Sequence, residues 1–548
     1  MFVIYNYFKF NIYYFYKKFN WIIFFFTYKR LSNFEYYNYK NEKINLNDPI
    51  YSFKSPKDIS FNKNCLFVSS GDYNQIPTEI VNIKAFEYCK SRSFILIPRD
   101  KKLKKIFNNF GFQNLIYWDE YLCNIKYKNV YKIFKDLNNF EDIKNLKINN
   151  SYYGKYTYST LIRNFNKLNF DLKDSKDSNN IIFNIYKSLI FYKSIEKIFS
   201  QINPDILFLT DNTYSPVGDL FDYAIDNNTE VIIFSLAHKN NSTAYKKYSK
   251  ENRSTHPFAL SEKTWSRLKD ISWHEEYKNK VDKELTYSYS SNQWYSSQAT
   301  AIKTKMFNPE ELRKKLNINN NKKVAIIFPN IFWDATYFWG QHLFKDYEEW
   351  FLNTVKEACK NKEVQWFIKI HPSNMVKMSE SKNFSEVCTI EEKVGKLPDN
   401  IRFIYPNEGI STHSLFSISD YCVTVNGTVG IEASIQGVTT ITSGKFRYDN
   451  LGFTIDSKTK KEYFLNLSKI EKIKSINNGQ IRLAYKFAYA TFIQKSIENK
   501  LVSYEYSKDY SLNSKNTFLF DFNYNLYDSI FFKKFASWLE SDNSDFIN

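Results

Sequence analysis

The sequence predicts an α/β protein built from two Rossmann-like domains that face each other across a cleft. At 548 residues the chain is too long for one ordinary core. Short apolar runs alternate with helical patterns in both halves, and this alternation starts again at residues 324–329, after a charged and Ser/Tyr-rich stretch at 278–304. Two such arrays joined by a linker imply two parallel sheets, with ligands bound at the carboxyl ends of their strands.

Nine apolar runs predict buried strands. In the first half they are CLFVS (65–69), FILIP (94–98), ILFLT (206–210) and VIIFS (231–235), and in the second half they are 324–329, 364–370, 401–405, 421–425 and 438–442. Residues 137–180 are rich in Asn, Lys, Asp and Ser, which indicates a loop or small helical insertion. We therefore expect an N-terminal domain at 1–290 and a C-terminal domain at 305–525. A helix and tail at 526–548 follow, with the apolar face of 529–540 packing near the interdomain region.

Composition favours an anionic partner without favouring nucleic acid. The net charge is +18 and the pI is near 9.1, but the lysines are spread along the chain and no zinc finger, RNP signature or basic heptad run is present. An AT-rich genome's codon supply would give the same bias. Six cysteines without CxxC spacing fit a reducing cytoplasm, and six histidines scattered singly predict no metal site.

The first 31 residues are aromatic-rich, but their longest uninterrupted apolar run (21–26) is too short to span a bilayer. No small-residue cleavage site suggests a secretory signal. The mixture of aromatic and lysine side chains suits a membrane interface, which would make the protein peripheral on the inner membrane face. A plain docking helix or strand of the N-terminal domain fits the same residues.

The segment DYCVTVNGTVGIEASIQGVTTITSG (420–444) is the most informative stretch. It predicts a strand, a turn at Asn426, Gly427 and Thr428, a short helix, and a second strand. Backbone N–H groups and the helix N-terminus would face outward there and suit an anionic group such as a diphosphate. Glu432, in the first turn of the helix, would accept hydrogen bonds from a ribose diol. The alternative is that Glu432 only complements its own helix N-terminus and the glycines only shape the turn.

Other polar residues follow predicted strands and are expected at the same edge of each sheet. In the second half, His371 could donate to a phosphate, Asp334 could act as a base or cap a helix, and Arg447 could bind phosphate bidentately. The alternative interpretation is that His371 has a purely structural role. In the first half, Asp72 and Asp211 could deprotonate an acceptor hydroxyl, although both are also ordinary turn residues. Further candidates near these strand ends are Asn330, Lys369, Ser411, Thr412 and Tyr448.

The second half resembles bacterial capsule polysaccharide biosynthesis proteins, which look like GT-B glycosyltransferases. Four motifs carry the resemblance, in this order: Trp333-Asp334, Lys369-Ile370-His371-Pro372, Asn426-Gly427-Thr428-Val429-Gly430-Ile431-Glu432-Ala433 and Gly444-Lys445-Phe446-Arg447-Tyr448. It covers roughly residues 320–465. The resemblance implies a nucleotide-sugar donor in the C-terminal domain, phosphate contacts from His371 and Thr428, and a ribose contact from Glu432. Lys445-Phe446 departs from the small, flexible residues expected after Gly444.

The function expected from this resemblance is sugar transfer to a surface (capsule-type) polysaccharide or its lipid-linked precursor. The partners would be a nucleotide-sugar donor, that acceptor and the inner-membrane surface, with no nucleic acid, no metal and no cofactor apart from the nucleotide-sugar substrate. The N-terminal domain would take the acceptor, with Asp72, Asp211 and Asp334 as candidate bases. The expected donor-binding residues are Asn330, Lys369, His371, Ser411, Thr412, Asn426, Gly427, Thr428, Gly430, Glu432, Arg447 and Tyr448. Two alternatives stay open: a sugar-nucleotide epimerase on the same fold, and a non-catalytic binding protein of capsule assembly or export.

Overall fold

The computed structural model describes residues 62–71, 75–148, 151–165, 167–239, 242–291, 303–334, 341–372, 374, 386–506, 514–519 and 526–548. The predictions for Asp72 and for the aromatic N-terminal segment fall outside the described residues.

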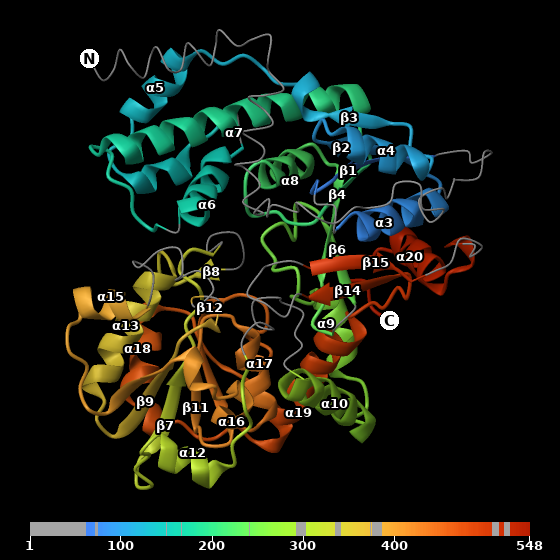
Figure 1. Cartoon of the computed structure of the whole chain (residues 1–548). Helices are drawn as coiled ribbons and strands as arrows, with labels where there is room; N and C mark the ends of the chain where they lie inside the picture. The colour runs from blue at the N-terminus through green and yellow to red at the C-terminus, as the bar shows by residue number, and fades with distance from the viewer. Residues whose placement is uncertain are drawn as a thin grey trace.

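The first sheet has the strand order β3-β2-β1-β4-β5-β6 (Figure 1). Its strands β1 (Lys63–Val68), β2 (Ser91–Ile97), β3 (Leu115–Tyr117), β4 (Ile206–Leu209) and β5 (Glu230–Leu236) run parallel, and β6 (Thr243–Tyr248) is antiparallel to β5. Both faces are covered, so alternate strand residues enter different cores. Cys65 and Phe67 of β1 pack with α3 (Ile76–Tyr88) and α4 (Lys101–Asn109), whereas Leu66 and Val68 pack with α7 (Ser175–Ile202) and α8 (Val217–Asp226).

Local sequence explains the helices of this domain. Asp100 and Asp174 accept hydrogen bonds from the first backbone N–H groups of α4 and α7, so each helix begins directly after its capping carboxylate. The polar insertion is helical and contains α6 (Tyr153–Phe165) together with the beginning of α7, and α5 (Tyr127–Lys135) precedes it. These helices build a separate core beside the sheet, which places the end of α6 toward the second domain.

The second sheet has the order β10-β9-β7-β11-β12-β13, and these six strands are parallel. They are β7 (Lys323–Ile327), β9 (Val364–Lys369), β10 (Ile401–Ile404), β11 (Tyr421–Val423), β12 (Thr439–Lys445) and β13 (Ile455–Ser457), while β8 (Gln341–His342) pairs antiparallel with β12. One face carries α13 (Tyr347–Lys360), α15 (Glu386–Lys393) and α18 (Lys460–Ser468). The other carries α12 (Pro309–Lys315), α16 (Thr412–Phe416) and α17 (Thr428–Ile435). The prediction of two Rossmann-like domains is therefore confirmed.

The chain crosses between the domains twice. After β6 it enters α9 (Glu262–Lys269) and α10 (Glu275–Ser291), which pack against α17 and α19 (Asn478–Ala488) of the second domain although they fall inside the range predicted for the first. It returns through a π-helical turn (Tyr489–Gln494), after which Ile497 bridges to Thr243 of β6. The hairpin of β14 (Val502–Tyr506) and β15 (Ser514–Phe518) then contacts α3.

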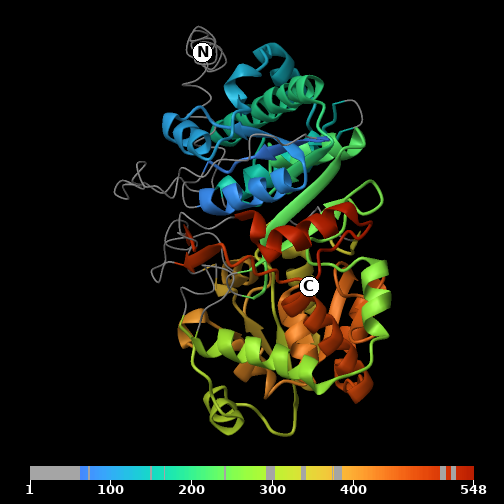
Figure 2. The ribbon, with the colours of Figure 1, turned by 90° about the vertical axis from the view of Figure 1, so that its right-hand side faces the viewer.

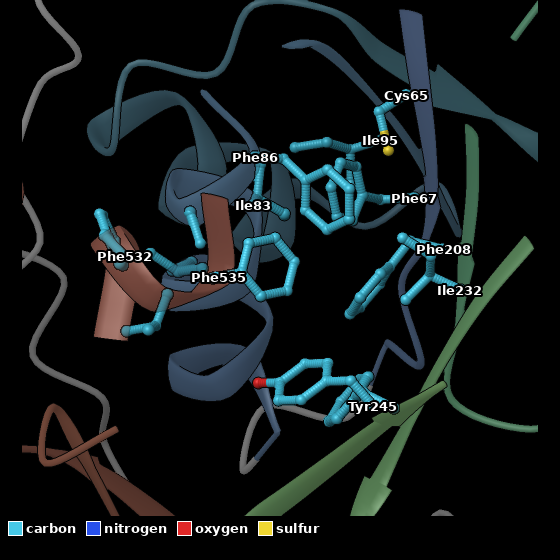
Figure 3. Close-up of a cluster of buried hydrophobic side chains, with 14 of the residues drawn as sticks. Cys65, Phe67, Ile83, Phe86, Ile95, Phe208, Ile232, Tyr245, Phe532 and Phe535 are labelled. Carbon is cyan, nitrogen blue, oxygen red and sulfur yellow. The ribbon is translucent and has the colours of Figure 1, made fainter. Parts of the chain in front are cut away.

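The last helix, α20 (Ile530–Glu540), packs on the core of the N-terminal domain at the level where the two domains meet (Figures 1 and 2). Figure 3 shows Phe535 of this helix directed toward Phe86, with ring centroids 5.0 Å apart, whereas Phe532 packs against Tyr88. Five large apolar side chains of α20 are no more than 7% exposed, and the burial of each stabilises the fold by about 1.5–3 kcal/mol. The chain end therefore belongs structurally to the N-terminal domain.

Among the residues that the structure describes, no helix is both long enough and apolar enough to cross a membrane.

Candidate functional site between the domains

Four adjacent strands bring their carboxyl ends to one edge of the second sheet. Asn330 follows β7, His371 follows β9, Asn426 follows β11 and Arg447 follows β12, and these strands are neighbours in the sheet. The Asn330 amide donates to the Asn426 side-chain oxygen at 2.8 Å. The structure therefore places these predicted residues on the edge that faces the N-terminal domain.

The turn before α17 is fixed by close packing. Gly427 is the N-cap of α17, and its carbonyl accepts a 2.8 Å hydrogen bond from the hydroxyl of Tyr448. A Cβ atom on Gly430 would lie 2.3 Å from that same hydroxyl, so only glycine fits there. These contacts give Gly430 and Tyr448 a part in shaping the turn, and their contact with donor stays a prediction.

Glu432, the predicted ribose acceptor, is 5% exposed and has a protein partner. The hydroxyl of Tyr289, near the end of α10, donates a hydrogen bond to the Glu432 carboxylate. Burial raises the pKa of the Glu432 carboxyl, against the opposing effects of Tyr289, Arg447 and Thr428. A ribose diol at this position would have to share Glu432 with Tyr289 or displace it.

Thr428 and Arg447 line a small cavity that residues of both domains enclose. His238 and Phe258 close it from the N-terminal side, and its remaining walls are Ile431, Phe487, Thr491 and Phe492. The Nε atom of Arg447 is buried without a hydrogen-bond partner among the described residues. The cavity of about 20 Å³ holds roughly one water molecule, so a phosphate group would need its walls to move apart.

Two histidines of the N-terminal side lie beside this cavity. His238 stacks on Phe492 with ring centroids 3.7 Å apart. Burial, together with the positive charge of Arg447, lowers the pKa of His238 to about 3. Burial and the charges of Arg447, Lys495 and Lys246 hold the pKa of His256 well below its usual range. Both imidazoles are therefore neutral near pH 7, which leaves Arg447 as the cation that lines the cavity.

A second cluster crosses between the domains at Asp334. The Asp334 Oδ1 atom accepts hydrogen bonds from Tyr214 at 3.0 Å and from Arg163 at 3.4 Å. Asp211, after β4, is close enough to Arg163 to interact electrostatically. Burial raises the pKa of the Asp211 carboxyl, while Thr213 and Arg163 act in the opposite direction. The structure thus brings the two described candidate bases, Asp211 and Asp334, to the same arginine.

The turn after β9 holds Lys369 and His371. Burial lowers the pKa of His371 to about 4 against the negative charge of Asp334, and it lowers the pKa of Lys369 to about 8. Glu386 of α15 supports this turn, because its carboxylate accepts the Asn374 amide at 2.8 and 2.7 Å and a backbone hydrogen bond from His371. His371 is therefore a neutral side chain that faces Asp334.

Ser411 is the N-cap of the short helix α16, which begins at Thr412 and lies between β10 and β11 in the chain. Ser411 is fully buried, and its hydroxyl has no hydrogen-bond partner among the described residues. Within those residues, no hydrogen bond joins Ser411, Thr412 or Lys369 to Arg447 or Thr428. Their contact with a donor stays a prediction.

Among the residues that the structure describes, there is no group of three or more His, Cys, Asp or Glu side chains that could hold a metal ion.

Sequence reasoning missed several residues that approach the site from the first domain or from the connecting helices. His238 follows β5 as Asp211 follows β4, so the same carboxyl-end rule could have found it. Arg163, Tyr289 and Phe258 lie on helices or in connections, where no strand pattern points to them.

The fold and this geometry define a two-domain α/β protein whose polar site lies at the carboxyl ends of parallel strands, between the domains. Residues 234–493 match the family described as capsule polysaccharide biosynthesis protein. The family resemblance predicted from the second half is thereby confirmed, and the matched region extends into β5 and β6 of the first sheet.

Comparisons with solved structures give weak likenesses. Thermosulfurimonas dismutans KpsC, beta Kdo 2,4 transferase, is 13% identical, with 52% of this chain and 79% of that chain covered and a TM-score of 0.32. The beta Kdo 2,7 transferase of the same organism is 12% identical (60% and 85% covered, TM-score 0.31). The S. aureus MnaA-UDP structure is 12% identical (79% and 92% covered, TM-score 0.27). No curated protein matches the chain. Likenesses this low bear on neither substrate nor mechanism.

Proposed function

We propose that this protein is a glycosyltransferase that moves a sugar from a nucleotide-sugar donor to a capsule-type polysaccharide or its lipid-linked precursor. The observation that carries the proposal is the cavity lined by Arg447 and Thr428, which lies at the N-terminus of α17 and is also lined by His238 of the N-terminal domain. The match to capsule polysaccharide biosynthesis proteins supports the class of product.

Donor binding would use the groups at this end of the site. Arg447 offers a planar fork of N–H donors to a phosphate, and the first backbone N–H groups of α17 lie beside Thr428. These fixed positive groups would stabilise the charge that develops on the departing nucleotide. Asn330, Asn426 and His371, at the same sheet edge, would contact the remainder of the donor. No resident cofactor enters the proposed reaction.

Acceptor activation would use the other end of the site. Asp211 or Asp334 would accept the proton of a sugar hydroxyl, and Asp72 remains a further candidate outside the described residues. Holding this hydroxyl against the anomeric carbon would supply much of the rate enhancement. We further propose that the protein works at the cytoplasmic face of the inner membrane, which its net charge of +18 and a lipid-linked acceptor both support.

The test is acceptor-dependent release of nucleotide. Purified protein is incubated with a panel of nucleotide sugars, with and without a lipid-linked oligosaccharide acceptor. Nucleotide release that requires the acceptor supports sugar transfer. Conversion of the donor sugar without acceptor supports an epimerase. If neither activity is observed, a non-catalytic binding role in capsule assembly is supported.

Variants sharpen this test. Asp211→Asn and Asp334→Asn should lower turnover while leaving donor affinity within about twofold, with the larger loss identifying the base. Asp119→Asn is the matched control, because Asp119 also pairs with an arginine (Arg99, 2.7 Å) and its partners lie in the N-terminal domain alone.

A further inference from the structure

Three chain segments meet at one arginine in the cleft. Arg163 comes from the end of α6, Asp211 and Tyr214 come from the loop after β4, and Asp334 comes from the loop after β7 of the other domain. Arg163 Nη1 lies 3.1 Å from the Tyr214 hydroxyl and 3.4 Å from Asp334 Oδ1. A side chain of the first domain therefore sets the position of a carboxylate that belongs to the second.

Aromatic rings hold the guanidinium of Arg163 in place. Its central carbon lies 4.9 Å from the centre of the Tyr214 ring and 5.2 Å from that of Trp333, which are cation–π distances. Trp333 is 2% exposed, so this wall is rigid, whereas the Asp334 side chain is 50% exposed. A fixed cation thus directs a partly exposed carboxylate.

The carboxylates of Asp334 and Asp211 have different hydrogen-bond partners. Asp334 Oδ1 is occupied by Tyr214 and Arg163. Asp211 Oδ1 accepts the backbone N–H groups of Asn212 and Thr213 and the Thr213 hydroxyl, at 2.6 to 2.9 Å. Among the described residues, no hydrogen bond reaches Asp211 Oδ2. The turn therefore fixes Asp211 through Oδ1, and Arg163 is close enough to interact electrostatically with the same carboxylate.

We infer that Asp211 accepts the acceptor proton and that Arg163 is its positioning residue, an inference that rests on the proposed transferase function. In the transfer step the acceptor oxygen bonds to the anomeric carbon, and the bond from that carbon to the phosphate oxygen breaks. The hydroxyl proton goes to Asp211 Oδ2, and the bonding electrons leave with the nucleotide. Arg163, held by its two aromatic walls, interacts with both Asp334 and Asp211 and so keeps the two carboxylates near one another.

The charge of Arg163 also has a measurable effect. The charged and titratable groups near Asp211 are Arg163 from α6 and Tyr214 from its own loop. Asp334 of the second domain also interacts with Arg163, and His371 interacts with Asp334. Burial raises the pKa of the Asp211 carboxyl and the positive charge of Arg163 lowers it, so removal of that charge raises this pKa further. A base must be ionised, so the acid limb of the activity profile would move to higher pH.

The experiment compares Arg163→Gln and Arg163→Lys with Arg99→Gln. Arg99 is a matched control because it also lies over a tyrosine (Tyr117, 4.5 Å) and pairs with two carboxylates, all within the N-terminal domain. Arg163→Gln should lower kcat about 10- to 100-fold, shift the acid limb of kcat upward in pH and leave the donor KM within about twofold. Arg163→Lys keeps the charge and should restore the pH position but only part of the rate.

Wild-type protein that transfers sugar while Arg163→Gln matches Arg99→Gln in rate and pH profile would overturn this inference alone. A loss confined to donor KM would overturn it as well, because Arg163 would then be a donor contact. Wild-type protein that neither binds nucleotide nor transfers sugar would remove the proposed function and this inference together. If Arg163→Gln fails to fold, the kcat of Arg163→Lys decides instead: a partial loss supports the inference, and a kcat equal to that of Arg99→Gln overturns it.

Discussion

Replacing Asp545 with asparagine should destabilise the junction between the two domains. Asp545, in the C-terminal tail, is 2% exposed and lies 3.1 Å from Lys246 Nζ and 2.7 Å from Lys495 Nζ. It also accepts the backbone N–H of Ser261 at 2.7 Å. Lys246 belongs to β6, Ser261 begins α9 and Lys495 follows the π-helical turn, so one carboxylate ties together both crossings of the chain.

The magnitude follows from burial. Removing one partner of a buried ion pair leaves uncompensated charge and costs about 3–5 kcal/mol. In a cooperative unit of roughly 250 residues, 1 kcal/mol corresponds to about 2 °C in Tm, so Asp545→Asn should lower Tm by about 6–10 °C. Asp542→Asn is the control, since the Lys263–Asp542 pair nearby is mostly exposed (62% and 82%) and should leave Tm unchanged.

The defect should depend on pH. Burial lowers the pKa of Lys495 to about 8 although Asp545 raises it, so without Asp545 this pKa falls further. A lysine whose folded pKa is below its unfolded value destabilises the fold at low pH, and this penalty is relieved as pH rises through the folded pKa. The Tm difference between Asp545→Asn and wild type should therefore shrink between about pH 7 and about pH 9.

The wild-type protein should itself lose stability at acid pH, in a range well below that of Lys495. Burial raises the pKa of Asp545, but Lys495 and Lys246 hold it well below its usual range. A depressed carboxyl pKa contributes stability above the unfolded value near 4 that is lost as pH falls toward the folded one.

The assay is thermal unfolding at about pH 7 and about pH 9, followed by circular dichroism and calorimetry. The double variant Asp545→Asn/Lys495→Met, which removes a buried charge, should recover part of the loss. An Asp545→Asn protein that melts within about 2 °C of Asp542→Asn at pH 7, or whose defect grows toward pH 9, would refute the reasoning.

Two further predictions use the same melts. Gly430→Ala should destabilise the protein by about 1–3 kcal/mol, because its Cβ would lie 2.3 Å from the Tyr448 hydroxyl. Gly479→Ala in the first turn of α19 should cost less, because its Cβ would lie 3.2 Å from the side-chain oxygen of Asn477. Equal Tm values for the two would show that the packing around Gly430 relaxes. Tyr289→Phe should cost about 1–3 kcal/mol because a buried carboxylate loses its donor, while Tyr287→Phe on the exposed side of α10 should cost little. A Tyr289→Phe protein as stable as Tyr287→Phe would argue against that bond.

Apolar pattern predicted the interior strands well, because a strand buried on both faces reads as a continuous apolar run. The strand β6 could not be found this way. Its lysines are buried by residues distant in sequence: Lys246 meets Asp545, and Lys247 Nζ donates to the carbonyls of Trp538, Leu539 and Ser541 at 2.9, 2.9 and 2.6 Å. No local window contains these partners, so the sequence of β6 reads as exposed.

The candidate site also contains some residues that could be predicted from the sequence and others that could not. Asn330, Asn426 and Asp334 were predictable because they follow parallel strands, and the carboxyl ends of such strands converge. Arg163 and Tyr289 come from helices, and they reach the site only through the packing of one domain on the other. Such residues become visible when the domain interface is known.

Titration of nucleotide into wild-type, Arg447→Gln and Arg313→Gln protein tests the central claim most directly. Arg313 lies on α12, before β7 and therefore at the opposite end of the sheet, so it controls for loss of one positive charge. With UDP, GDP and CMP as probes in calorimetry, at least one should bind wild type and Arg313→Gln equally. Arg447→Gln should bind it about 10- to 100-fold more weakly at an unchanged Tm, as expected for loss of a charged hydrogen bond of about 1.5–3 kcal/mol. Wild-type protein that binds none of the three, or Arg447→Gln protein with wild-type affinity, would contradict the assignment of this cleft as a nucleotide-sugar site.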